Sequence, residues 1–343
     1  MTLLKKTYNR DIFHGGDLNW AKTHFGSDGP KWIDVSTGIN PAPYPVPDLP
    51  IEAWTRLPET AQEDALLSAA RKYYSVPKTA AIVACPGTQS ALQLIPTLRQ
   101  QSTIAILSPT YAEHANCWKL AGHEVLEVAS LTQIPSAADV VVVVSPNNPT
   151  GRFADTEVLL KLQKKLSNKG GWLIVDEAFM DMTPSSSSTL YLPQENTLIL
   201  KSFGKFFGLA GLRLGFVIGD EKIVSRINSC LGPWALSGIA SHVGATAFKD
   251  PNWSRITREK LKRDSQRLRD LLIQAQMKII GGTDLFTLIT MQDASSLFTH
   301  LCTNRILTRP FPERPEHLRI GLPTGEENWQ RLSTALSDWK ISR

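Results

Sequence analysis

A single lysine, Lys205, stands inside the segment 202–216, SFGKFFGLAGLRLGF, with Ser202 three residues before it and Arg213 eight residues after it. A hydroxyl group and a guanidinium are suited to binding an anionic phosphate. The flanking phenylalanines and leucines are apolar, and such side chains rarely coat an exposed loop. The alternative is a lysine in a solvated loop, since charged side chains are mostly exposed. The pattern favours a lysine that forms a Schiff base with pyridoxal 5′-phosphate (PLP), with Ser202 and Arg213 near the phosphate.

An acidic side chain, Asp176, comes directly after the apolar run GWLIV. A carboxylate that faces a pyridine nitrogen keeps this nitrogen protonated, and the protonated ring withdraws the electrons left when a bond to Cα breaks. An aspartate at this place is otherwise a helix cap or a surface carboxylate. Asp176 is therefore the candidate partner of the cofactor's ring nitrogen.

Three further turns follow apolar runs. Gly87 and Thr88, in PGTQ, allow a close approach of the backbone to an anion, although a plain turn has the same pattern. Tyr111, in SPTY, offers an aromatic face to a cofactor ring, or simply packs at the start of a helix. Asn148, in SPNNPTG, is placed to donate to a phenolic oxygen, or belongs to an ordinary turn.

Short runs of Val, Ile and Leu, each followed by an amphipathic segment, begin near residue 80. This alternation predicts strands buried on both faces of a mostly parallel sheet, in an α/β domain over 51–225. In such sheets ligands bind beyond the carboxyl ends of the strands, where the residues above all lie. Residues 226–343 predict a smaller α+β domain with connecting helices. Residues 1–50, rich in proline, predict an arm that also contributes to the small domain.

The composition is that of a soluble globular protein: 343 residues, 42% hydrophobic and 20% charged. The net charge of +5 includes no basic run of the kind that binds nucleic acid. The four cysteines are far apart, which predicts neither a metal site nor a disulfide framework. The longest apolar run, 140–144, is too short to span a membrane, and the first residues lack the apolar core of a signal peptide. A cytoplasmic protein is expected.

The motifs together resemble those of the fold-type I PLP-dependent enzymes, the aspartate aminotransferase superfamily, over nearly the whole chain. PTY, SPNNPTG, VDEAF, the segment around Lys205 and LRIGLPTGEEN are similar to the histidinol-phosphate aminotransferase branch. HGG, STGINP and WTRLPE more closely resemble the threonine-phosphate decarboxylases of cobalamin biosynthesis, which is the subfamily that the sequence favours. The implied fold is a large domain around a seven-stranded type of sheet, plus a smaller domain.

The resemblance also implies roles for individual residues. Lys205, Asp176 and Tyr111 are the implied catalytic residues, with Tyr111 stacking on the cofactor ring and Asn148 bonding the ring oxygen. The implied phosphate ligands are Gly87, Thr88, Gln89, Ser202 and Arg213.

The implied substrate residues come from both ends of the chain. Arg319, in HLRIGL, corresponds to the arginine that grips the substrate carboxylate, and Arg309, in ILTRPF, to a second substrate-facing arginine. Each of the two arginines is otherwise a surface salt-bridge partner. His14 and Asn40 are candidates for the phosphate or carboxylate end of the substrate. No metal is implied.

The implied reaction is the decarboxylation of L-threonine O-3-phosphate to (R)-1-aminopropan-2-yl phosphate, the precursor of the cobalamin linker, by a homodimer. Two positions depart from the related aminotransferases, since Phe179 and Leu57 stand where those enzymes carry tyrosines. A histidinol-phosphate type of aminotransferase is the first alternative. The second is a non-catalytic PLP-fold binding module, although no helix-turn-helix segment precedes the fold.

Overall fold

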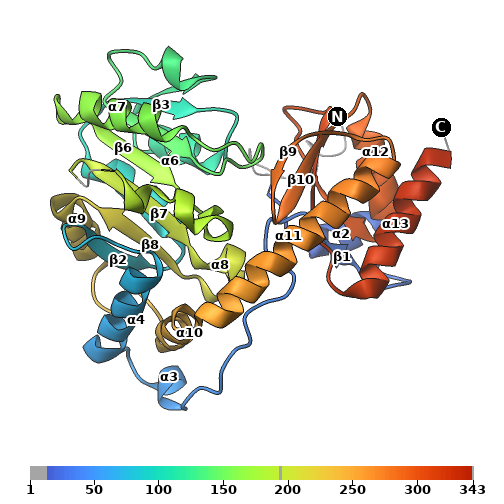
Figure 1. Cartoon of the computed structure of the whole chain (residues 1–343), viewed down its shortest axis with the longest axis horizontal. Coiled ribbons are helices and arrows are strands. Elements are labelled where there is room, and N and C mark those ends of the chain that lie inside the picture. The colour runs from blue at the N-terminus through green and yellow to red at the C-terminus, as the bar shows by residue number, and fades with distance from the viewer. Residues whose placement is uncertain (1–13, 193–194, 342–343) are drawn as a thin grey trace. The chain divides into compact units, whose positions relative to one another are not determined.

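A computed structural model describes residues 14–192 and 195–341, and the chain divides into two units (Figure 1). Unit 1 is built from both ends of the chain, Met1–Ala42 and Ile256–Arg343. Unit 2 is Pro43–Arg255. The first 13 residues of the expected N-terminal arm lie outside the described residues.

Unit 2 contains a seven-stranded sheet with the order β2-β8-β7-β6-β5-β3-β4. All neighbouring strands run parallel except β8, which is antiparallel to both β2 and β7. The strands are β2 (Ala81–Cys85), β3 (Thr103–Leu107), β4 (Glu124–Val128), β5 (Val140–Val144), β6 (Trp172–Asp176), β7 (Thr197–Ser202) and β8 (Gly215–Gly219).

Strand β5 shows why this sheet forms. Its five residues are all valine, whose branched side chain favours the extended backbone. Val140 and Val142 pack into an apolar cluster on one face of the sheet, and Val141 and Val143 pack into a second cluster on the other face. A strand without polar alternation is therefore buried on both sides, as the sequence predicts.

Helices cover both faces of this sheet (Figure 1). Side chains of α5, α6 and α9 belong to the first cluster, and side chains of α7 belong to the second. The helices of unit 2 are α3 (Glu52–Thr55), α4 (Thr60–Tyr73), α5 (Thr88–Leu94), α6 (Glu113–Leu120), α7 (Thr156–Ser167), α8 (Phe203–Phe206), α9 (Glu221–Leu231) and α10 (Gly238–Phe248).

Unit 1 combines a four-stranded antiparallel sheet, in the order β12-β13-β10-β9, with a short parallel pair, β1 and β11. Its strands are β1 (Ile33–Asp34), β9 (Lys278–Thr283), β10 (Phe286–Thr290), β11 (Ile306–Leu307), β12 (Arg309–Pro310) and β13 (His317–Gly321). Its helices are α2 (Leu18–Phe25), α12 (Ala294–Thr303) and α13 (Gly325–Ile341).

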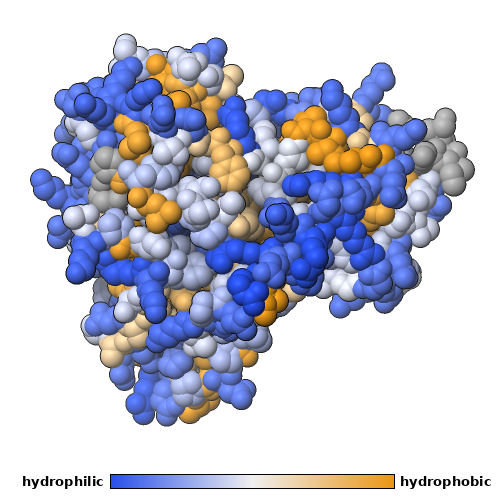
Figure 2. All heavy atoms as spheres, viewed as in Figure 1, coloured by the Kyte–Doolittle hydropathy of each residue, from blue (hydrophilic) through white to orange (hydrophobic). Residues whose placement is uncertain are grey.

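The long helix α11 (Pro251–Gln274) contains the boundary between the units. Its exposed side is strongly hydrophilic (Figure 2). Its buried positions recur every three or four residues, which is the spacing of one helix face. They include Thr257, Leu261, Ser265, Leu268 and Leu272. Among the described residues, none of the helices combines the length and the apolar character that crossing a bilayer requires.

The structure confirms the predicted fold class, a large α/β unit with a mostly parallel seven-stranded sheet and a smaller α+β unit. The unit boundaries differ from the expected 51–225 and 226–343, because α9, α10 and the start of α11 belong to unit 2. The segment 1–50, expected as an arm, contains helix α2 and strand β1. Tyr44 anchors its proline-rich part, since the Tyr44 N–H donates to the carbonyl of Phe207 at 2.8 Å.

Candidate active site

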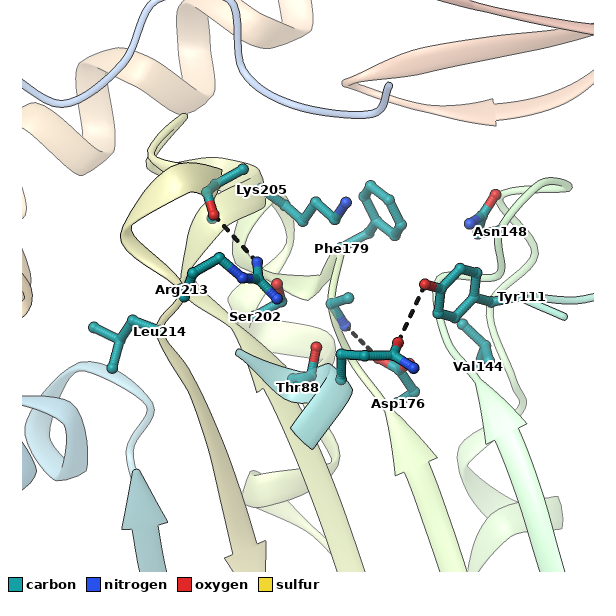
Figure 3. Close-up of a pocket in the computed structure, with 14 residues that line it drawn as sticks. Thr88, Tyr111, Val144, Asn148, Asp176, Phe179, Ser202, Lys205, Arg213 and Leu214 are labelled. Atoms are coloured by element: carbon teal, nitrogen blue, oxygen red, sulfur yellow. Dashed lines mark hydrogen bonds between the residues drawn. The ribbon is translucent and has the colours of Figure 1, made fainter. Parts of the chain in front are cut away.

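One pocket of unit 2 lies beyond the carboxyl ends of β5, β6 and β7 (Figure 3). It collects side chains from five segments that are far apart in the sequence. In Figure 3, Tyr111 and Asn148 lie on one side of the pocket, and Ser202 and Arg213 lie on the other. The lining residues are Thr88, Gln89, Tyr111, Val144, Asn148, Asp176, Ala178, Phe179, Ser202, Gly204, Lys205, Ala210, Arg213 and Leu214.

Lys205 reaches this pocket from α8, the single helical turn that follows β7. The neighbouring rings of Phe203, Phe206 and Phe207 are fully buried, so this lysine is not part of a solvated loop. Its Nζ lies 5.7 Å from the centre of the Phe179 ring. A rigid aromatic base and a short helix therefore hold an amine inside the pocket.

The pocket ends in a cradle between Gly87 and Arg213. Gly87 has φ 73°, and a Cβ at this position would lie 2.4 Å from Nη2 of Arg213. Arg213 has a left-handed backbone, with φ 54° and ψ 59°, and its Nη1 donates to the carbonyl of Ala210 at 3.2 Å. With the hydroxyl-bearing Thr88 and Ser202 on the same pocket, the cradle combines a cation with hydroxyl donors, as a phosphate requires.

We expect Gly87→Ala to raise the Kd for PLP about 10- to 100-fold. The new methyl group would displace the guanidinium of Arg213, and losing a charged hydrogen bond costs about 1.5–3 kcal/mol. Titration of the apoprotein with PLP, followed by absorbance, measures this change. Gly211→Ala is the control, because a Cβ at Gly211, two residues before Arg213, meets no other atom within 4 Å. Equal affinities of the two variants would contradict the role of the cradle.

Asp176 ends β6 with a buried and well-oriented carboxylate. Its Oδ1 accepts the N–H of Ala178 at 2.9 Å, and its Oδ2 lies 2.9 Å from Nε2 of His114. His114 is itself buried, at 1% exposure. Both oxygens are thus fixed, which leaves the carboxylate little freedom to turn away from the pocket. Sequence reasoning missed His114, because nothing in the local sequence marks its approach to Asp176.

A chain of hydrogen bonds holds Tyr111 at the pocket wall. The hydroxyl of Tyr111 donates to Oε1 of Gln89 at 3.3 Å, and Nε2 of Gln89 donates to the carboxylate of Glu113 at 3.1 Å. The ring of Tyr111 also meets that of His114 edge to face, with centroids 6.1 Å apart. Gln89, which the resemblance assigns to the phosphate, thus contacts Tyr111 here, and its phosphate contact stays a prediction.

The loop after β5 presents Asn148 to the pocket, while the side chain of its neighbour Asn147 is engaged with the loop after β3. Asn147 accepts the hydroxyl of Thr110 at 2.7 Å, and its amide donates to the carbonyl of Pro109 at 2.9 Å. The two adjacent asparagines therefore have different roles. One shapes the loop, and the other has its side chain at the pocket.

The four predicted substrate residues belong to unit 1. Arg309 and Arg319 are paired neighbours on β12 and β13. Nη2 of Arg319 donates to the carbonyl of Ser36 at 2.8 Å. Burial, together with the charge of Arg309, lowers the pKa of Arg319 to about 9, while the charge of Asp34 opposes this shift. An anion bound at this pair would compensate two neighbouring positive charges.

His14 and Asn40 lie in the N-terminal part of unit 1. The residue after His14 lies against Ser36, where a Cβ on Gly15 would meet the Ser36 carbonyl oxygen at 2.6 Å. Asn40 is buried, and its side-chain oxygen accepts the N–H of Ala42 at 2.9 Å. The turn at Ser36 therefore connects the HGG segment to Arg319 within unit 1.

The fold and the pocket together define a fold-type I PLP-dependent enzyme: a mostly parallel sheet carries, at its carboxyl ends, a lysine, a carboxylate, an asparagine and a glycine–arginine cradle. The donor set fits the cofactor, and the cradle leaves room where a Cβ would intrude. The chain belongs to the aminotransferase class I and II family, whose family model matches residues 49–336.

The most similar relatives include two threonine-phosphate decarboxylases. That of Pseudomonas aeruginosa is 42% identical over 329 residues, covering 95% of this chain and 98% of the relative. That of a Sinorhizobium species is 40% identical and covers 96% and 99%. A histidinol-phosphate aminotransferase from Nostoc is 28% identical over 90% of this chain and 92% of the relative.

Solved structures agree in fold. The histidinol-phosphate aminotransferase from Clostridium acetobutylicum matches with a TM-score of 0.77 at 21% identity, covering 90% of this chain and 99% of that one. L-threonine-O-3-phosphate decarboxylase from Porphyromonas gingivalis matches with a TM-score of 0.71 at 18% identity, covering 97% and 98%.

These comparisons confirm the resemblance that the motifs indicate, and they confirm an enzyme whose cofactor is PLP. The pocket gathers every residue predicted for the cofactor except Gly87, which lies beside it in the cradle. The roles of the individual residues stay predictions.

Proposed function

We propose that this chain is a PLP-dependent threonine-phosphate decarboxylase that releases CO2 and forms (R)-1-aminopropan-2-yl phosphate, for the aminopropanol linker of cobalamin. The observation that carries the proposal is the 42% identity to a threonine-phosphate decarboxylase over nearly the full length of both chains. The aminotransferases are more distant, since the Nostoc relative is 28% identical.

The residues of unit 2 would act on the cofactor and on the Cα of the substrate. When bound, PLP supplies a ring that accepts the electron pair released from a bond to Cα. Asp176 would hold a proton on the ring nitrogen, and Asn148 would donate to the ring oxygen. The amine of Lys205 would hold the cofactor in the resting enzyme and would return a proton at Cα during the reaction. Proton return at that atom completes a decarboxylation.

The residues of unit 1 would recognise the two anionic ends of the substrate. Arg319 is buried and its neighbour Arg309 is partly buried, and an anionic group would compensate their adjacent positive charges. The carboxylate of threonine phosphate is such a group, and His14 and Asn40 are proposed for the phosphate or carboxylate end. By binding the carboxylate, these residues would set the orientation of the substrate, and the bound cofactor would supply the electron sink for the bond to Cα that breaks.

One assay separates decarboxylation from transamination. The purified holoenzyme is incubated with L-threonine O-3-phosphate and no keto acid, and CO2 and the phosphorylated amine are measured. We expect stoichiometric release of both. Turnover only with 2-oxoglutarate and an amino-acid donor would instead indicate an aminotransferase. A bound PLP without turnover of either substrate would indicate a binding module.

We also propose that the protein is a cytoplasmic homodimer. Unit 2 exposes four large apolar side chains from two neighbouring segments, α3 with its flanks and the loop before α10, and these segments meet where Gly238 packs against Ala53. The four are Ile51, Trp54, Leu57 and Trp234, each at least 60% exposed. Large apolar side chains exposed on neighbouring segments are typical of contact surfaces. Sedimentation analysis of the purified protein tests the oligomeric state, and a monomer would refute the proposed homodimer.

A further inference from the structure

A buried ion pair, Glu177 with Lys201, lies at the ends of β6 and β7. The carboxylate of Glu177 is fully buried and Lys201 is 2% exposed, yet neither residue lines the pocket. Nζ of Lys201 contacts Glu177 and also donates to the hydroxyl of Ser187 at 2.8 Å. It lies 5.1 Å from the centre of the Tyr74 ring. The proposed chemistry gives no role to this pair.

The carboxylate of Glu177 has further donors besides the lysine. The hydroxyl of Ser187 and the N–H of Ser188 each donate to it at 2.6 Å. Burying two charges has a large desolvation cost, so such a pair contributes little net stability compared with apolar residues of the same volume. Its hydrogen bonds do, however, select a single arrangement of the groups that make it.

The position of the pair connects it to the pocket. Glu177 directly follows Asp176, and Lys201 directly precedes Ser202. The N–H of Glu177 donates to the carbonyl of Leu200 at 2.9 Å, which continues the pairing of β6 with β7. Side chains alternate along a strand, so Asp176 and Ser202 face the pocket while Glu177 and Lys201 face the opposite side of the sheet.

We propose that the Glu177–Lys201 pair is a positioning device. It fixes the end of β6, which carries Asp176, relative to the end of β7, which leads through Ser202 into Lys205. The inference rests on the proposed cofactor site, because the separation it controls is that between the carboxylate at the ring nitrogen and the lysine amine. A shift of about 1 Å between such groups can cost about 100-fold in rate.

The double variant Glu177→Gln with Lys201→Met tests the proposal, because it removes both charges at similar volume and leaves no lone buried charge. We expect kcat to fall about 10- to 100-fold with KM within about threefold of wild type. We expect the Kd for PLP to rise about tenfold and the absorbance band of the bound cofactor to shift. Lys201→Arg, which keeps the charge, should retain most of the PLP affinity.

Gln163→Leu controls for plain destabilisation. Gln163 is a buried polar residue of α7 that donates to Ser167 and to the carbonyl of Glu195, away from the pocket. We expect it to lower Tm without changing the cofactor band or the Kd for PLP. A double variant that behaves like Gln163→Leu would overturn the proposal. If the double variant does not fold, Lys201→Arg decides the question. A Lys201→Arg protein with the Tm of wild type but with a lower PLP affinity would then overturn the proposal. A wild-type protein that binds no PLP would overturn the proposed function as well.

Discussion

Lys205→Ala protein should fold, bind PLP only weakly and lose at least about 1000-fold in kcat. The lysine is the only one among the pocket residues, and its amine has two proposed tasks, the covalent attachment of the cofactor and proton return at Cα. Positioned proton transfer alone contributes about 100- to 10,000-fold. Steady-state CO2 release measures the loss, and the absorbance of the bound cofactor near the visible edge reports the missing attachment.

Lys201, four residues earlier, provides an internal check on this result. Borohydride reduction of the wild-type holoenzyme followed by peptide mapping should label Lys205 and leave Lys201 unlabelled, because Lys201 faces the other side of the sheet and pairs with Glu177. Lys222→Ala, at an exposed lysine of α9, should behave as wild type. Labelling at any position other than Lys205, or an active Lys205→Ala protein, would refute the assignment of the cofactor lysine.

Asp176→Asn should lower kcat about 100- to 1000-fold while the cofactor remains bound to Lys205. The amide keeps the shape of the side chain but removes the negative charge that would hold the ring-nitrogen proton. Removing one preorganised electrostatic group from an active site typically has an effect of this size. CO2 release by the purified variant, compared at equal PLP content, measures the change.

Two further variants test whether the loss of kcat comes from the missing charge of Asp176. His114→Asn should cost about tenfold or less, because the carboxylate of Asp176 retains its charge and its bond from Ala178. Asp155→Asn removes a carboxylate that caps α7 by accepting the N–H of Val158 at 3.0 Å, and it should leave kcat unchanged. An Asp176→Asn enzyme within about tenfold of wild type would show that the ring nitrogen needs no charged partner here.

The geometry of parallel sheets explains why the sequence predicts which side chains line this pocket. Val144, Asp176 and Ser202 each stand at the last position of a strand, and parallel strands end at one edge. A local pattern of an apolar run followed by a polar residue was therefore enough to collect side chains that are distant in the chain. For Lys205 the signal is a different one, namely the apolar residues on either side of it in the sequence.

The sequence did not predict what depends on contacts across the fold. His114 is defined by its approach to Asp176, and Glu177 by its approach to Lys201; neither pairing has a local signature. The sequence singles out Asn148, but it does not indicate that the side chain of Asn147 bonds Thr110 and Pro109 in the loop after β3. The sequence predicts a boundary near residue 225, whereas unit 2 extends to Arg255. The difference arises because helices α9 and α10 carry no sequence marker of the unit against which they pack.

The pairing of β1 with β11 determines the order in which the two units can fold during synthesis on the ribosome. Ile33 of β1 pairs with Ile306 of β11, so β1 cannot form its pairing until most of the chain has been translated. Unit 2, by contrast, is one continuous stretch that is completed earlier, and domains generally fold as units during synthesis. Until then Trp20 and Trp32, both buried in the finished fold, lack the residues that cover them, so the nascent chain exposes apolar surface of the kind that promotes aggregation.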